Sequence, residues 1–164
     1  MSPCNRPVFG FIKSFRPLGT GMDTCPFCRI ISGDLPGTIV HQDPVSLVIM
    51  DMQPINPGHM LVLPREHISR LSDLPADDGG RLFNLAQRLS QALFQSGIPC
   101  QGVNLLLSDG QVAGQEIPHL HHHVVPRHEG DGFGFQFSPR HAELPTREEL
   151  AKNAYHIKQA LLLE

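Results

Sequence analysis

The sequence contains no tryptophan and only one tyrosine in 164 residues. Proteins that hold single-stranded nucleic acid usually stack its bases on aromatic side chains, so this composition disfavours that function. The chain also lacks an excess of positive charge, because its formal net charge is −3 with its ten histidines counted as neutral. A polyanion would meet no broad basic surface. We therefore expect no nucleic-acid partner.

Long apolar runs are missing as well. No segment approaches the ~20 apolar residues that cross a bilayer, and residues 1–21 lack the continuous apolar stretch of a secretory signal. We therefore expect a cytoplasmic protein with no membrane association. Cysteines in such a protein are thiols or metal ligands rather than disulfides; the four in this chain are Cys4, Cys25, Cys28 and Cys100.

Proline and glycine punctuate residues 1–21, which we predict to be a flexible extension, with Met22 as an alternative start. The remaining residues, 22–164, are long enough for one domain with a buried core. Within it we distinguish a motif-bearing core, 23–127, from a C-terminal loop and helix, 128–164.

The hydrophobic pattern predicts strands at 38–41, 46–51, 59–63 and 102–107, and a fifth strand entered at Pro118. Leucines at helical spacing predict a helix over 74–96 that covers the sheet. Thr146 and Glu149 fit a capping box at the start of a helix over 146–163. The fold class is therefore α+β, with about five antiparallel strands, one long covering helix and a C-terminal helix.

Four histidines occur within five positions, at 119 and 121–123. Alternate residues of a strand share a face, so His119, His121 and His123 are predicted to lie on one face and His122 on the other. Imidazole can act as a nucleophile, carry protons near neutral pH, or bind a metal. An expression tag and a packed structural cluster are the alternatives, and the internal position argues against a tag.

Cys25 and Cys28 form a C-x-x-C pair, which can be half of a zinc site, a redox dithiol or a coincidence. Gly33 and Pro36 end any helix soon after it, whereas a redox dithiol usually opens a long helix. Zinc is the favoured interpretation, with two further ligands to come from histidines. Asp51 closes a predicted strand, where a lone aspartate is ordinarily a turn former.

Taken together, these residues resemble the histidine triad (HIT) family, whose motif is His-φ-His-φ-His-φ-φ with φ apolar. The resemblance covers roughly residues 23–127. Its matching segments are the triad at 119–125, Asp51 to Pro54, Pro57 to Ile68, Gly114-Gln115 and Pro126-Arg127.

The resemblance implies a nucleotide hydrolase or nucleotidyl transferase that attacks the α-phosphate of a nucleoside phosphoramidate, an adenylate or a dinucleoside polyphosphate. His121 would be the nucleophile and form a nucleotidyl-histidine. We expect its ring to be held by a carbonyl of the strand at 102–107. The other implied catalytic residues are His123, which would bind phosphate oxygens or the leaving group, Gln115, which would donate to the phosphate, and His119.

The resemblance also assigns residues that bind substrate and metal. Asp51 would hold the ribose hydroxyls, and Ser108 would assist Gln115 at the phosphate. The walls around the base would be Phe27, Ile31, Met52 and His59. A structural Zn²⁺ would be held by Cys25, Cys28, His67 and His119, with no organic cofactor. The family further implies a nucleotide substrate as the ligand and a homodimer.

Three residues depart from the family pattern: His122 replaces an apolar residue, Ser108 stands where asparagine is common, and Glu116 stands where serine or threonine is common. The last two bear on substrate choice. One alternative function is a zinc-stabilised nucleotide-binding module with little catalysis. Another is a hydrolase that uses the three triad histidines as ligands to an open metal site.

Overall fold

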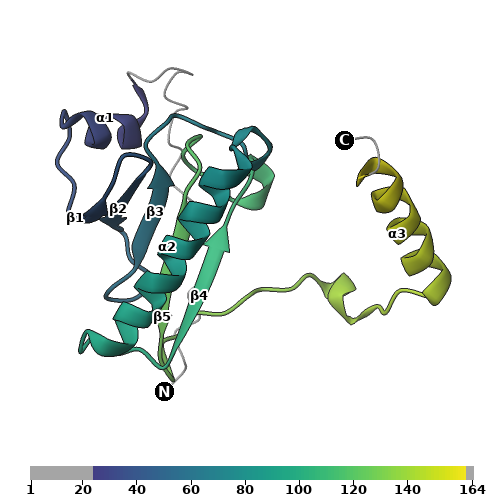
Figure 1. Ribbon diagram of the computed structural model, residues 1–164. Helices are drawn as coiled ribbons and strands as arrows, with labels where there is room; N and C mark the ends of the chain where they lie inside the picture. The colour runs from purple at the N-terminus through teal and green to yellow at the C-terminus, as the bar shows by residue number, and fades with distance from the viewer. Residues whose placement is uncertain (1–23, 162–164) are drawn as a thin grey trace. The chain divides into compact units, whose positions relative to one another are not determined.

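The computed structural model describes residues 24–161. A five-stranded antiparallel sheet has the strand order β1-β2-β3-β5-β4 (Figure 1). The predicted fold class is confirmed, while the predicted extension at 1–21 lies outside the described residues. The strands are β1 (Ile39–Gln42), β2 (Ser46–Met50), β3 (Met60–Pro64), β4 (Gly102–Leu107) and β5 (His122–Arg127), and the helices are α1 (Pro26–Ser32), α2 (Ala76–Gln95) and α3 (Arg147–Leu161).

Strand β3 is buried along its whole length because both faces of the sheet are covered. Met60 and Val62 belong to one apolar cluster, whereas Leu61 and Leu63 belong to another. Alternate residues point to opposite faces of a strand, so the sheet separates two cores. The first core lies under α2, and the second contains Phe27 of α1.

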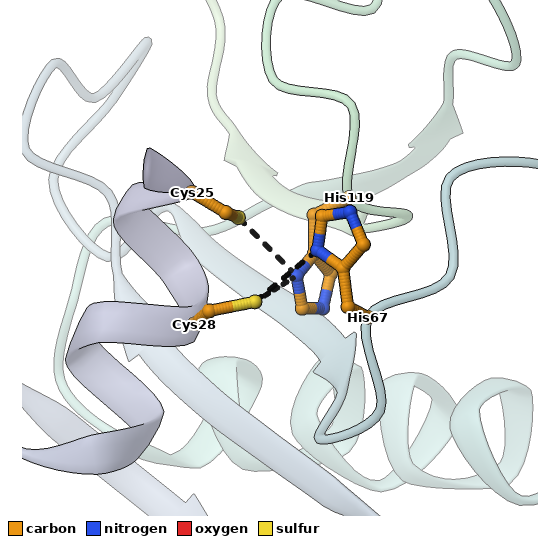
Figure 2. Close-up of side chains that lie close together, drawn as sticks. All are labelled: Cys25, Cys28, His67 and His119. Carbon is orange, nitrogen blue, oxygen red and sulfur yellow. Dashed lines mark hydrogen bonds between the residues drawn. The ribbon is translucent and has the colours of Figure 1, made fainter. Parts of the chain in front are cut away.

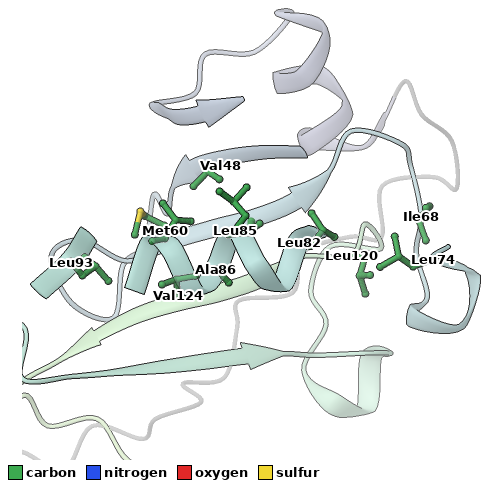
Figure 3. Packing of buried hydrophobic residues seen from close by; sticks show 12 residues of the cluster. Val48, Met60, Ile68, Leu74, Leu82, Leu85, Ala86, Leu93, Leu120 and Val124 are labelled. Carbon is green, nitrogen blue, oxygen red and sulfur yellow. The ribbon is translucent and has the colours of Figure 1, made fainter. Parts of the chain in front are cut away.

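Helix α2 begins after Pro75 with two acidic residues, Asp77 and Asp78, in its first turn, where they complement the helix dipole. It runs across one face of the sheet (Figure 1). Its predicted bounds, 74–96, are one or two residues too wide. Figure 3 shows its apolar residues packed against the sheet; the buried ones are Leu82, Leu85, Ala86, Leu89 and Leu93.

Helix α1 is short for a local reason. Pro26 starts it, and Gly33 ends it in the left-handed conformation with φ 90°, which residues with a Cβ seldom adopt. The helix therefore presents Cys25, Phe27 and Cys28 within two turns and then returns the chain to β1.

Strand β5 begins later than predicted. The N–H of His119 bonds to the carbonyl of Ile117, and that of Leu120 bonds to the carbonyl of Ile68, so the first triad residues pair with loops. The ladder with β3 starts at His122 opposite Val62. The alternation persists, because Leu120 packs in the cluster under α2 while the rings of His119 and His121 contact Phe27.

Contacts divide the described chain into a unit that ends at Gly132 and a second unit that starts at Phe133. The second unit contains α3, which has no buried residue. Its predicted capping box is present: Thr146 Oγ1 accepts the N–H of Glu149 at 3.2 Å, and Glu149 Oε2 accepts the N–H of Thr146 at 2.8 Å. Between residues 24 and 161, no helix combines the length and apolar character needed to cross a membrane.

Candidate functional site

Imidazole rings from two parts of the chain meet at the start of β5. The ring centroids of His121 and His123 lie 4.9 Å apart, and that of His59, just before β3, lies 5.2 Å from His123. Phe27 of α1 packs its ring against His121 at 5.1 Å. The result is a row of histidines with an apolar wall on one side.

His121 is held in one tautomer by the backbone. Its Nδ1 lies 2.7 Å from the carbonyl oxygen of His119, and because a carbonyl can only accept, Nδ1 carries the hydrogen. Nε2 therefore keeps its lone pair. Burial lowers the pKa of His121, so the ring is neutral at pH 7 and chemically able to act as a nucleophile.

This acceptor differs from the expected one. We predicted a carbonyl of the strand at 102–107, but the bond goes to the residue two positions earlier in the same segment. The reason is that residues 119–121 precede the β5 ladder, so the His119 carbonyl is free to turn toward the following ring.

His59 orients His123 in a similar way. The N–H of Ile55 donates to Nδ1 of His59 at 3.2 Å, which makes that nitrogen an acceptor. A neutral imidazole then carries its hydrogen on Nε2, which donates to Nδ1 of His123 at 3.0 Å. His123 is left with its own hydrogen on Nε2, as a potential hydrogen-bond donor. Burial lowers the pKa of His123 to about 4.

Asp51 stands at the other side of His59. Its Oδ2 lies 3.3 Å from Nδ1 of His59, and its Oδ1 accepts the N–H of Gln53 at 2.8 Å. Burial lowers the pKa of His59, although the charge of Asp51 opposes this effect. With His59 neutral, the carboxylate remains a hydrogen-bond acceptor beside the row of histidines.

A second cluster joins α1 to the sheet. Figure 2 shows four side chains pointing toward one another: Cys25, Cys28, His67 and His119. Cys28 Sγ lies 3.2 Å from Nδ1 of His67, and Nδ1 of His119 lies 3.5 Å from Cys25 Sγ and 3.6 Å from Cys28 Sγ. All four ligand atoms lie within 4.8 Å of one another. This is the donor set and spacing of a closed tetrahedral metal site.

The ring of His119 is oriented for this role. Its Nε2 donates to the carbonyl of Pro64 at 2.8 Å, so Nδ1 faces the two sulfurs without a hydrogen. Such a bond to a carbonyl is the usual support of a ligating histidine. Burial and the neighbouring Cys25 raise the pKa of Cys28 to about 11.

The other residues predicted to bind substrate differ in their surroundings. The Gln115 amide donates to the carbonyl of Ser69 at 2.9 Å and accepts the N–H of Gly110 at 2.8 Å, so it braces the loop before the triad. Ile31 is partly buried and packs against the second core, which contains Phe27. Ser108 follows the end of β4 and is half-buried. Met52 is 89% exposed and forms no wall in this structure.

Asp51, His59 and His123 also offer ligand atoms within 4.8 Å of one another. Within this group His59 and His123 are already joined by a hydrogen bond, and the Nδ1 lone pair of His59 is already used by Ile55. Among residues 24–161, the three triad histidines do not form a ligand group by themselves. This arrangement disfavours the alternative in which the triad holds a catalytic metal.

Comparisons with known proteins agree on one family. The model of the HIT domain matches residues 32–130. An uncharacterized HIT-like protein of Methanocaldococcus jannaschii is 38% identical over 66% of this chain and 82% of its own length. An adenosine 5'-monophosphoramidase of Schizosaccharomyces pombe is 30% identical over 63% of this chain and 74% of its own. The crystal structure of a zinc-bound histidine triad family protein from Mycobacterium smegmatis is 37% identical, covers 79% of this chain and 88% of that one, and superposes with a TM-score of 0.67.

Proposed function

The chain belongs to the HIT family, and from that premise we propose that it is a nucleotide hydrolase or nucleotidyl transferase in which His121 attacks an α-phosphate. Its substrates are nucleoside phosphoramidates, adenylates or dinucleoside polyphosphates. The observation that carries the proposal is the bond from His121 Nδ1 to the His119 carbonyl, which leaves Nε2 neutral and bare. The similarity to a monophosphoramidase supports this reaction class.

The proposed reaction has two steps. Nε2 of His121 forms a bond to the α-phosphorus, and the bond to the leaving group breaks as that group takes its electron pair and a proton from water, while the Nε2–H of His123 donates a hydrogen bond to it. A second water then attacks the phosphorus and gives up a proton to solvent, and the nucleoside monophosphate leaves as His121 recovers its lone pair. The hydrogen bond from His59 to His123 supports this hydrogen-bond donor role, because it keeps the His123 hydrogen on Nε2.

For substrate binding, we assign the ribose hydroxyls to Asp51, whose carboxylate remains an acceptor. Phe27 and Ile31 form the apolar side of the base pocket, and His59 and Met52 complete it when nucleotide is present. Ser108 and Gln115 contact the phosphate, although the Gln115 amide must give up one of its present bonds to do so.

We further assign a structural zinc ion to Cys25, Cys28, His67 and His119. Two thiolates and two imidazoles satisfy four-coordinate zinc, and the Pro64 carbonyl supports the His119 ring. The ion would fix α1, and with it Phe27, against the sheet. His119 then serves catalysis through its carbonyl, which orients His121. The ligand of the protein is a nucleotide rather than a nucleic acid, and the edge position of β4 suits a homodimer with a continuous sheet.

Replacement of His121 tests the proposal. His121→Ala should abolish turnover of adenosine phosphoramidate, measured as AMP release, while the circular dichroism spectrum and zinc content stay those of wild type. His122→Ala is the matched control, because residue 122 lies opposite Val62 on the face toward α2. It should keep activity near the wild-type level. A wild-type protein that binds AMP but releases none from adenosine phosphoramidate or diadenosine tetraphosphate would favour a nucleotide-binding module instead.

A further inference from the structure

The carboxylate of Asp131, beyond the end of β5, is almost completely buried, with its side chain 3% exposed. It accepts hydrogen bonds from Arg127 Nε at 2.6 Å and Nη2 at 2.8 Å, from the N–H of His128 at 3.3 Å, and from Asn56 Nδ2 at 2.8 Å. A buried ion pair of this kind is weak evidence for stability, because apolar residues often replace one without loss. Its connections suggest a different use.

Asn56 carries the connection into the loop between β2 and β3. It is buried, and its Nδ2 also donates to the carbonyl of Pro126 in β5 at 2.9 Å. The backbone carbonyl of Asn56 accepts the N–H of His59 at 3.1 Å. The side chain of Asn56 thus joins the middle of this loop to β5 and to Asp131.

The loop that Asn56 anchors bears both Asp51 and His59. Its ends are joined by the bond from the Asp51 N–H to the His59 carbonyl at 3.0 Å, and the Ile55 N–H sets the tautomer of His59. His59 in turn donates to His123. A continuous series of bonds therefore runs from Arg127 through Asp131, Asn56 and His59 to His123.

We propose that Asp131 is a positioning residue, which acts through Asn56 to hold the Asp51–His59 loop and the hydrogen bond from His59 to His123. The inference rests on the proposed function, since it gives the loop a role in binding ribose and in orienting His123, the hydrogen-bond donor to the leaving group. A shift of about 1 Å in such groups is enough to change rates by as much as ~100-fold.

Asp131→Asn tests this role, with Asp43→Asn as the matched control. The Asp43 carboxylate likewise accepts hydrogen bonds from nearby groups, namely the N–H groups of Val45 and Ser46 and the Ser46 hydroxyl. Unlike Asp131, it lies in the β1–β2 turn and is not connected to His59 through these bonds. We expect Asp131→Asn to lower kcat/KM for adenosine phosphoramidate roughly tenfold or more. The control should stay within about twofold of wild type, since its carboxylate supports a turn rather than the site.

A second readout separates positioning from general stability. Nitrogen-15 spectra of the imidazoles report the hydrogen positions on His59 and His123, and Asp131→Asn should shift these signals while Asp43→Asn leaves them unchanged. Asn56→Ala keeps the Arg127–Asp131 pair but removes the link, so it should reproduce the kinetic loss even if Asp131→Asn folds poorly.

Wild-type kcat/KM and unchanged imidazole spectra in both Asp131→Asn and Asn56→Ala would overturn the inference. Absence of turnover in wild type would instead count against the proposed function, and the imidazole spectra would still decide whether Asp131 positions His59.

Discussion

At the scale of single residues, histidines two positions apart present opposite ring nitrogens. The Pro64 carbonyl fixes the hydrogen of His119 on Nε2 and leaves Nδ1 facing two sulfurs. The His119 carbonyl fixes the hydrogen of His121 on Nδ1 and leaves Nε2 bare. The same residue type thus presents Nδ1 to two sulfurs at one position and a bare Nε2 at the other, and backbone carbonyls make the distinction.

Glu116 gives a prediction about substrate choice. The side chain of Glu116 is exposed. Burial lowers the pKa of His121, and the negative charges of Asp51 and Glu116 act in the opposite direction, so Glu116 lies close enough to influence that ring. A carboxylate there repels an anionic leaving group. Glu116→Gln should therefore raise kcat/KM for diadenosine tetraphosphate relative to adenosine phosphoramidate, by roughly three- to tenfold at low salt. An unchanged ratio of the two values would show that Glu116 does not select the leaving group.

The sequence alone predicts which residues gather in the two clusters, but not the hydrogen bonds that they make. The alternation of 119, 121 and 123 and the C-x-x-C spacing pointed to both clusters. The hydrogen bond between His59 and His123 is not predictable from the pattern, because it depends on β3 lying next to β5. The hydrophobic periodicity of a strand does not reveal which strand lies beside it. Gln115 was assigned to phosphate without its bonds to Ser69 and Gly110, which depend on how two loops meet.

At the scale of elements, α2 shows why the fold was easier to predict than the site. Its buried residues recur at helical spacing, so the pattern alone identified the helix and its inner face. The start of β5 was less predictable. The Leu120 N–H bonds to the Ile68 carbonyl, which is a tertiary contact, and the ladder with β3 therefore begins only at His122.

The inner face of α2 should carry much of the stability. Leu82 is fully buried, whereas its neighbour Phe83 is 55% exposed. Leu82→Ala should lower the free energy of unfolding by about 2–5 kcal/mol, because it leaves a cavity in a packed core. Phe83→Ala should cost about 0.5 kcal/mol or less, as exposed positions usually do. Urea denaturation of both variants measures the difference, and equal losses would contradict the assigned packing.

At the scale of the whole molecule, the cysteine–histidine cluster joins segments that are distant in sequence. Its ligands come from α1, from the loop after β3 and from the segment before β5. A metal ion bound there would stabilise the folded chain. It would also fix α1, whose Phe27 contacts the ring of His121, so the proposed metal site and the proposed nucleophile would share one support.

Metal removal tests that connection. A strong chelator should lower the Tm of wild type but leave Cys28→Ser little changed, because that variant has already lost a ligand. Cys100→Ser is the control, since Cys100 packs beside the α2 core instead, and it should respond as wild type does. Zinc must displace the proton of Cys28, whose pKa burial raises to about 11, so zinc affinity should increase from pH 6 to pH 8. Equal chelator responses in all three proteins would contradict the metal assignment.

The proposed function requires that His121 becomes covalently nucleotidylated, and intact mass spectrometry detects this adduct. Each of three proteins is mixed briefly with adenosine phosphoramidate or diadenosine tetraphosphate and quenched, and its intact mass is measured. The proteins are wild type, His121→Ala and His122→Ala. We expect one added AMP moiety on wild type and on His122→Ala, and none on His121→Ala. An adduct that persists in His121→Ala, or AMP release by wild type with no adduct at any quench time, would contradict it.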